Sequence, residues 1–361
     1  MGMLKTKKQE LAIFLIIVGV AAFFRLYQLD TLRISSATVG ILTVIGLYFL
    51  VKELFEWRLA AIASFLTATS FWHVNFSRME SAAIIIPFTL VYSFYLLGKG
   101  LKKASLPYFF VAGIFGGLGF YTNSLCVAPI ITIFLFLNYW WYLKKDFSHD
   151  KYEYAKTKLL QGFVVFAFTI FIVALPLGIY FWQHQEELLA RIPNSLTINN
   201  VVKTLGMFNF TGDWNPAHNT TGSTEFLGWL KHSQETTPSP MLPWPIGVFF
   251  AVGFINEFIH WLKRKHGHFS TAHTLLFAWF FVTLIPGFLS ATAPDALLTI
   301  GALPVVMIFT ARGIWWFFNK LSSWYGMRDT HSKHEAHAIT ALVMIIFLFS
   351  VGFMEYWRYF K

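Results

Sequence analysis

The chain is poor in charged residues. Only 13% of its 361 residues are Asp, Glu, Lys or Arg, about half of the roughly 25% that is typical of soluble domains. Its 18 acidic residues are too few for an acidic tail or a solvated domain, whereas hydrophobic residues make up 56% of the chain. This composition excludes a soluble globular protein, a disordered chain and a coiled coil. It predicts a membrane protein.

Three further features are missing. Cys126 is the single cysteine, which excludes an intrachain disulfide and a thiolate metal cluster. The net charge of +10 forms no basic stripe, because the basic residues lie in small groups between apolar runs, so no nucleic acid partner is expected. No internal repeat of fixed period is present, which argues against the inverted-repeat architectures of secondary transporters.

Long stretches without charge take up most of the chain, and about 20 apolar residues suffice to span a bilayer as a helix. The longest, Ala104–Leu143, has 40 residues and therefore predicts two helices that turn near Tyr121–Ser124. Gly113 and Gly117 have the GxxxG spacing of close helix packing. The other candidate spans are Leu11–Phe24, Ile34–Val51, Leu59–Ser77, Ser81–Gly98, Leu159–Gln185, Thr236–Asn256, His266–Pro294, Ala296–Ala311 and Ala336–Met354. The sequence thus predicts an all-α, polytopic protein of about eleven transmembrane helices in a single domain, residues 1–361.

The first span also has the length of a signal-peptide core. Phe24-Arg25-Leu26-Tyr27 stands where a small-residue cleavage site is needed, so we expect an uncleaved helix. If the N-terminus is cytoplasmic and the spans alternate, 19 of the 28 Lys and Arg residues lie on the cytoplasmic side and 8 outside. The positive-inside rule favours this orientation in the cytoplasmic membrane.

One external loop, Gln183–Pro240, is long and polar. Long loops in compact domains are usually functional or disordered. The spacing of its apolar residues predicts short amphipathic helices on the membrane surface. These residues are Leu188, Leu189, Val201, Val202, Leu205 and Met207.

Polar residues collect between the third and fourth spans, in FWHVNFSRMES. His73, Asn75, Arg78 and Glu80 fall between two apolar helices, and charges at such a position are costly unless they are paired or face a cavity. This pattern indicates a site. The alternative is an interfacial anchor, with Trp72 in the aromatic belt and Arg78 on lipid phosphate.

A second group is GDWNPAHN in the long loop. Asp213, Trp214, Asn215, His218 and Asn219 offer the hydrogen-bonding groups and the aromatic face that a sugar requires. The alternative is an ordinary Asx-rich turn.

Asp295 follows Pro294 at an external junction of two spans. A carboxylate at this position is expected to cap the helix that begins at Ala296. Capping does not exclude a role in a site.

Four segments in the same order carry a resemblance: LRISSATVGILTVIGLYFLVKELF, SFWHVNFSR, GIFGGLGFYTNS and TLGMFNFTGDWN. Together they resemble bacterial GT-C-type membrane glycosyltransferases, the group that contains protein O-mannosyltransferases and aminoarabinose transferases. The resemblance implies transfer of a sugar from a polyprenyl-phosphate donor at the external face, usually with inversion. It also implies an acidic general base in a long first external loop, often with a divalent metal nearby.

The chain departs from this family at the base. Only RLYQLDTL joins the first helix to Arg33, with Asp30 as its sole acid, so the family's Asp-Glu motif is missing. Ala82, Ala217 and Leu298 stand where similar sequences place arginines. The chain thus keeps the family's membrane scaffold but lacks several residues expected in its donor site, which predicts lipid binding with poor turnover.

We therefore assign roles by resemblance. Glu80 is the first candidate for base or metal ligand, with Asp213 and Asp295 behind it as catalytic residues, and Glu80 or Asp213 would hold any divalent metal. Arg78 would bind the donor phosphate. The other substrate-binding candidates are His73, Asn123, Trp214, Asn215, His218 and Asn219.

The expected partners are a polyprenyl-phosphate sugar donor, membrane lipids and an acceptor that is a lipid, a glycan or a protein. The short first connection favours an alternative, a non-catalytic relative that binds or moves a lipid-linked sugar. An unrelated solute transporter is a third reading, which the missing repeat and the sparse intramembrane charge disfavour.

The predicted topology places Gly222 outside the cell. In a variant that lacks Cys126, Gly222→Cys should react with a membrane-impermeant maleimide in intact cells, because the 19-to-8 distribution of basic residues puts the long loop outside. Protection of this cysteine until the cells are lysed would overturn the topology.

Overall fold

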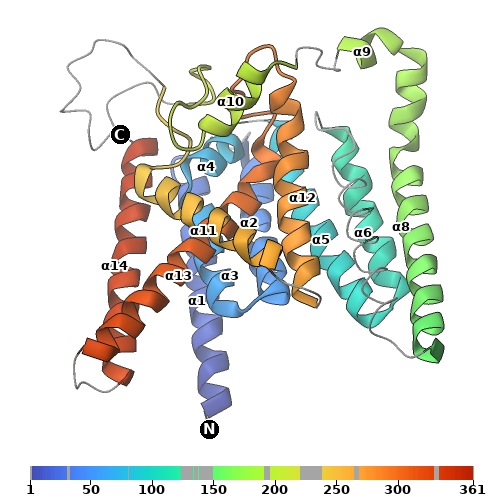
Figure 1. Ribbon diagram of the computed structural model, residues 1–361. Coiled ribbons are helices and arrows are strands. Elements are labelled where there is room, and N and C mark those ends of the chain that lie inside the picture. The colour runs from blue at the N-terminus through green and yellow to red at the C-terminus, as the bar shows by residue number, and fades with distance from the viewer. Residues whose placement is uncertain are drawn as a thin grey trace.

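The computed structural model describes residues 2–30, 33–79, 81–122, 133, 137, 149–190, 196–219, 238–263, 268–328 and 333–360. These residues are almost entirely helical and contain no β-strand (Figure 1). The elements are α1 (Gly2–Leu26), α2 (Ile34–Leu54), α3 (Trp57–Thr69), α4 (Phe71–Arg78), η2 (Ala82–Ile84), α5 (Ile85–Lys103), α6 (Leu106–Leu118), η3 (Gly119–Tyr121), α8 (His149–Gln183), α9 (Gln185–Ala190), α10 (Ile198–Gly206), α11 (Trp244–Lys263), α12 (His268–Phe288), η4 (Ile300–Ala302), α13 (Leu303–Arg328) and α14 (Lys333–Phe360).

Seven helices in the described part are long and apolar enough to cross a membrane. These spans are Lys7–Leu26, Ile34–Leu54, Ala82–Lys103, Lys156–Gln183, Trp244–Lys263, Ile300–Trp324 and Ala338–Phe360, with shorter apolar helices at Leu106–Tyr121 and Ala272–Phe288. The predicted all-α, polytopic fold is confirmed. In the uncharged run that begins at Ala104, the described helical part ends with η3 at Tyr121, where we expected a turn. Most of the rest of this run lies outside the described residues.

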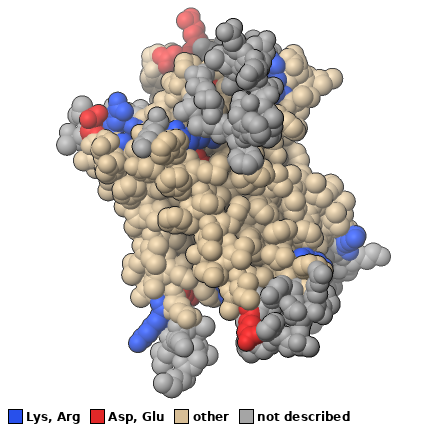
Figure 2. Space-filling model, turned by 90° about the vertical axis from the view of Figure 1, so that its left-hand side faces the viewer, with Lys and Arg blue, Asp and Glu red and all other residues tan. Residues whose placement is uncertain are grey.

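Charge is distributed as a membrane requires. On the face in Figure 2, Lys, Arg, Asp and Glu lie near the two ends of the molecule, and uncharged residues form the broad band between them. On α8 and α14, which stand on opposite sides of the bundle in Figure 1, apolar side chains such as Phe168 and Phe349 are exposed. These side chains would face lipid acyl chains. The end of the bundle that carries α9, α10 and the C-terminus is called the α10 end below.

The span predicted at Leu59–Ser77 is not one continuous helix. It breaks at Ser70, between α3 and α4. The carbonyls of Thr67 and Ala68, which would otherwise accept from the next turn, accept from the Arg25 guanidinium at 3.2 and 2.9 Å. The backbone N–H of Phe71 donates to Glu355 on α14 at 3.1 Å. The carbonyls of Thr67 and Ala68 and the N–H of Phe71 thus all have partners at the break, as buried backbone groups require.

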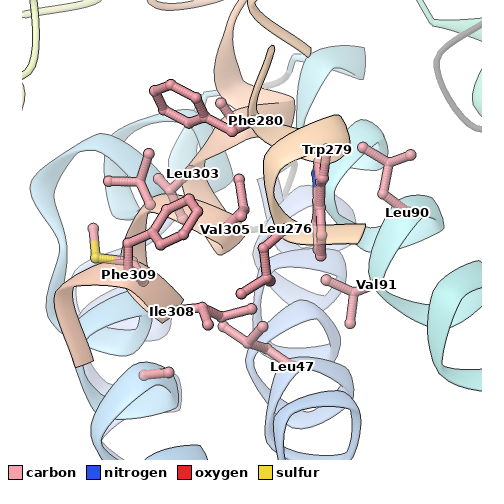
Figure 3. Packing of buried hydrophobic residues seen from close by; sticks show 14 of the residues in the cluster. Leu47, Leu90, Val91, Leu276, Trp279, Phe280, Leu303, Val305, Ile308 and Phe309 are labelled. Carbon is pink, nitrogen blue, oxygen red and sulfur yellow. The ribbon is translucent and has the colours of Figure 1, made fainter. Parts of the chain in front are cut away.

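The core lies where α12 and α13 pack against α2 and α5. Figure 3 shows Leu276 and Trp279 of α12 among Ile308 of α13, Leu47 of α2 and Val91 of α5. The buried Trp279 indole donates to the Gly301 carbonyl at 2.8 Å, which satisfies its polar atom inside an apolar cluster.

Glycines set the closest helix contacts. A Cβ at Gly113 or Gly117 would collide with Thr169 or Val173 of α8, which confirms the close packing that their spacing predicts. A Cβ at Gly253 of α11 would run into the Phe309 carbonyl of α13. Backbone cannot move aside as a flexible side chain can, so α11 and α13 are pressed together at this point.

Gly253→Ala should therefore lower stability. Alanine normally favours a helix over glycine by about 1 kcal/mol, but forcing an extra carbon against packed backbone costs about 1–3 kcal/mol. We expect a lower thermal unfolding midpoint in detergent. Gly98→Ala in α5 is the matched control, because no atom lies within 4 Å of its added Cβ, and its midpoint should stay or rise. Equal midpoints for the two variants would contradict the described packing.

Candidate active site

Three of the predicted residues come together at the α10 end. Asp213 and His218 belong to the loop that follows α10, and Asp295 belongs to the turn between α12 and η4. One side-chain ligand atom from each residue lies within 4.8 Å of the other two. The cluster thus combines two carboxylates and an imidazole from two segments that are far apart in the sequence.

The Asp213 carboxylate is almost completely buried and has three partners. Its Oδ1 accepts from the Asn215 backbone N–H at 2.8 Å. Its Oδ2 accepts from the Ala296 backbone N–H at 2.8 Å and lies 2.8 Å from His218 Nδ1. A buried carboxylate is tolerated when its lone pairs are taken up in this way. Asp213 therefore joins its own loop to the turn that carries Asp295.

The His218 ring is held with one nitrogen inward. A carboxylate accepts only, so Nδ1 is assigned the proton that faces Asp213. The other nitrogen, Nε2, is then an acceptor, with the Asn215 amide at 3.5 Å as its weak donor. The Phe76 ring lies 5.3 Å from the imidazole, centroid to centroid. About 14% of the His218 side chain is exposed, so the residue is reachable and not fully buried.

The loop around these residues is fixed by α4, α14 and its own backbone. Asn75 of α4 donates from Nδ2 to the carbonyls of Ala217 and His218, both at 3.2 Å. Asn219 donates to the Ser239 carbonyl at 2.8 Å and accepts from Arg358 of α14 at 3.1 Å. The predicted substrate-binding residue Asn219 thus has structural partners on both sides.

Asp295 caps a turn, and not the helix that we expected to begin at Ala296: residues 296–299 form a turn, η4 begins at Ile300 and α13 begins at Leu303. Its Oδ1 accepts from the backbone N–H groups of Leu297 and Leu298, both at 3.0 Å. Burial raises the pKa of Asp295, and the nearby Asp213 carboxylate adds to the increase, whereas the N–H groups oppose it. Oδ2 retains only a long contact of 3.4 Å from Thr292. One carboxylate oxygen is therefore held by backbone N–H groups, and the other has this long contact.

Two predicted residues of α4 bind protein groups. His73 is fully buried, and its Nδ1 accepts from Arg25 at 2.6 Å. Arg78 donates to the carbonyls of Phe24, Arg25, Tyr27 and Gln28 at the end of α1, with the Tyr27 bond at 2.6 Å. Both residues thus tie α4 to α1. Their roles in substrate binding stay predictions.

The remaining predicted residues fall into two groups. Trp214 is 57% exposed beside Asp213 and presents a free aromatic face, and Asn215 contributes both the bond to Asp213 and the contact to His218. Glu80 and Asn123 lie outside the described residues.

Sequence reasoning missed two residues that support this site, Arg25 and Arg358. Arg25 supports the break before α4, and Arg358 holds the loop together with Asn75. The sequence pattern included Asn75, but it gave this residue no role of its own. Arg25 and Arg358 gave no local signal, because each acts on a residue more than 40 positions away.

The three clustered residues do not by themselves complete a divalent-cation site, although each offers one ligand atom. Both Asp213 oxygens and Asp295 Oδ1 already accept N–H groups, and His218 Nδ1 faces a carboxylate. Asp295 Oδ2 and His218 Nε2 are the least engaged donor atoms, whereas Mg²⁺ and Ca²⁺ take six or more mostly oxygen ligands, so water or substrate would have to supply the others. A metal site that includes Glu80 stays a prediction, because that residue lies outside the described part of the chain.

Comparisons with known proteins agree with this architecture. Residues 8–175, just under half of the chain, match the family described as dolichyl-phosphate-mannose-protein mannosyltransferase. A search of curated proteins found no significant match.

Solved structures extend the likeness over most of the chain. The apo oligosaccharyltransferase of Archaeoglobus fulgidus has a TM-score of 0.54 at 16% identity, over 91% of this chain and 45% of that one. Its complex with an inhibitory peptide and a dolichol-phosphate gives 0.53 at 16% identity, over 93% and 44%. The chain spans less than half the length of these structures. At this identity the likeness shows the fold alone.

Two substitutions of Asp295 separate its capping from its charge. Asp295→Asn keeps an oxygen that can accept from Leu297 and Leu298, whereas Asp295→Ala loses it and should cost about 1 kcal/mol of stability. Because the pKa of Asp295 is raised in the folded state, wild-type stability should fall as pH rises through that pKa. Asn cannot ionise, so the difference in stability between Asp295→Asn and the wild type should shift in favour of the variant as the pH rises. Thermal midpoints in detergent across pH 4 to 8 test this, and parallel curves for wild type and Asp295→Asn would contradict it.

Proposed function

We propose that the chain transfers a sugar from a polyprenyl-phosphate donor, because residues 8–175 match a mannosyltransferase family and the fold is similar to that of an archaeal oligosaccharyltransferase. The reaction would take place at the α10 end, which the distribution of basic residues assigns to the external face of the cytoplasmic membrane. The acceptor would be a hydroxyl group of a lipid, a glycan or a protein.

The observation that carries the proposal is the cluster of Asp213, His218 and Asp295 at one end of a membrane scaffold. Glycosyl transfer to a hydroxyl needs a group that takes its proton and an electrostatic partner for the departing phosphate. The cluster offers two carboxylates and an imidazole, and Trp214 beside it offers a face for a sugar ring.

The surroundings of the cluster suit a lipid-linked donor. On α10 the side chains of Ile198, Val202 and Leu205 recur at helical spacing and are all exposed. An exposed apolar helix face of this kind is stable at the boundary between headgroups and acyl chains. A polyprenyl chain would remain in the membrane while its phosphate and sugar reach the loop that follows α10.

One observation favours a second function, in which the protein binds or moves a lipid-linked sugar without transferring it. α1 ends at Leu26 and α2 begins at Ile34, so the connection has no room for the long first loop that holds the general base in similar proteins. A relative that binds or moves a lipid-linked sugar without transferring it would also have this connection. Catalysis requires that another residue supplies the base.

Transfer and binding can be measured side by side in purified protein. Radiolabelled dolichyl phosphate mannose, with polyprenyl-phosphate glucose and aminoarabinose beside it, is offered with Ser- and Thr-containing peptides and with membrane glycolipids. We expect label in one acceptor class and retention of the lipid in a binding assay. Binding without transfer would favour the non-catalytic relative. Absence of both would contradict the proposal, and Glu80→Gln shows in parallel whether the residue first expected to be the base is needed.

A further inference from the structure

We propose that His218 is the general base of the transfer and that Asp213 is the residue that positions it. This assignment rests on the proposed function. It replaces the missing first-loop carboxylate with an imidazole from the loop after α10.

The hydrogen bonds define the tautomer that a base needs. Asp213 Oδ2 lies 2.8 Å from His218 Nδ1, and a carboxylate in this position holds the proton on Nδ1. The lone pair of Nε2 is then available. In the described part of the chain, the Asn215 amide lies 3.5 Å from Nε2, a long contact that an incoming hydroxyl can displace.

The ring is positioned before substrate arrives. Asn75 holds the His218 carbonyl, Phe76 lies beside the imidazole, and the Asp213 carboxylate is itself fixed by the N–H groups of Asn215 and Ala296. A base held by a second group that is in turn held by backbone loses little freedom on binding substrate.

The two carboxylates of the cluster differ in whether they could act as the general base. Asp213 is 4% exposed and both of its oxygens are occupied, so an acceptor hydroxyl cannot reach it. Asp295 uses Oδ1 to cap its turn and has Oδ2 left. Asp295 is therefore the rival for the role, and its removal must be tested beside that of His218.

The reaction balances with the groups present. The acceptor hydroxyl gives its proton to His218 Nε2 while its oxygen forms a bond to the anomeric carbon. The bond from that carbon to the phosphate oxygen breaks, and the polyprenyl phosphate leaves with the electron pair. The imidazolium is stabilised by the Asp213 carboxylate and later returns its proton to water.

Azide distinguishes a base from a residue that merely binds substrate. Azide is an anion and has no proton to lose, so its attack on the donor needs no base, whereas attack by a hydroxyl does. The experiment uses the full-length protein in detergent with the donor and acceptor found above, and it compares acceptor-dependent transfer with formation of glycosyl azide.

His218→Gln should lower acceptor transfer by about 10²–10⁴-fold and leave glycosyl azide formation within a few-fold of wild type. Asp213→Asn should lower kcat for acceptor transfer to a similar extent and change the donor KM little. The variant no longer holds the His218 proton on Nδ1, but it leaves the donor-binding groups in place. Asp295→Asn tests the rival base, and it should lower acceptor transfer far less than His218→Gln does. His184→Gln, an exposed histidine beside α9, is the matched control and should behave as wild type.

Three results would overturn the assignment. If His218→Gln keeps acceptor transfer, the base lies elsewhere. If it loses both reactions equally, His218 binds the donor or supports the fold. If Asp295→Asn alone loses acceptor transfer and keeps azide transfer, Asp295 is the base. A wild-type protein without either reaction would instead refute the proposed function itself.

Discussion

The candidate site depends on one buried carboxylate. Asp213 accepts from its own loop, faces His218 and accepts from Ala296 in the turn between α12 and η4. A hydrogen bond to a charged group contributes about 1.5–3 kcal/mol, and a buried charge that loses a partner costs at least as much. This carboxylate sets the position of the loop and the orientation of the imidazole. It therefore also sets how far His218 lies from Asp295.

The membrane scaffold brings α4 beneath that loop. Arg25 takes up the carbonyls of Thr67 and Ala68, which lets the chain break at Ser70 and begin α4 in a new direction. α4 then presents Trp72 to the turn of Ala296, whose carbonyl accepts from the indole at 3.1 Å, and Asn75 to the backbone of His218. A polar network that satisfies the break thus also positions the site.

Periodicity and composition predicted much of the fold because they are local. Uncharged runs located the long helices, and the spacing of Gly113 and Gly117 located a close contact with α8. The break at Ser70 could not be predicted in this way, because it depends on Arg25 and Glu355 from distant helices. An uncharged run has the same appearance with or without such partners.

The same reasoning applies to the site. The GDWNPAHN pattern pointed to Asp213 and His218. The capping argument predicted that Asp295 would accept from backbone N–H groups, but not that a turn would stand where a helix was expected to begin. The pattern could not tell that Asp213 turns inward and His218 outward, because that choice depends on the Ala296 N–H, which comes from 83 positions further along the chain. Arg78 had the charge expected of a phosphate ligand, yet its guanidinium meets four backbone carbonyls of α1 and its connection.

The central claim is that the headgroup of a lipid-linked sugar binds at the α10 end. A polyprenyl phosphate with a photoreactive group next to its phosphate, crosslinked to the full-length protein in lipid vesicles and mapped by mass spectrometry, tests this directly. The account predicts labelled peptides from the loop around Trp214 and from the turn around Asp295, competed away by unlabelled polyprenyl phosphate. Competed labelling at the opposite end instead, near the α2–α3 connection at Phe55, would contradict it.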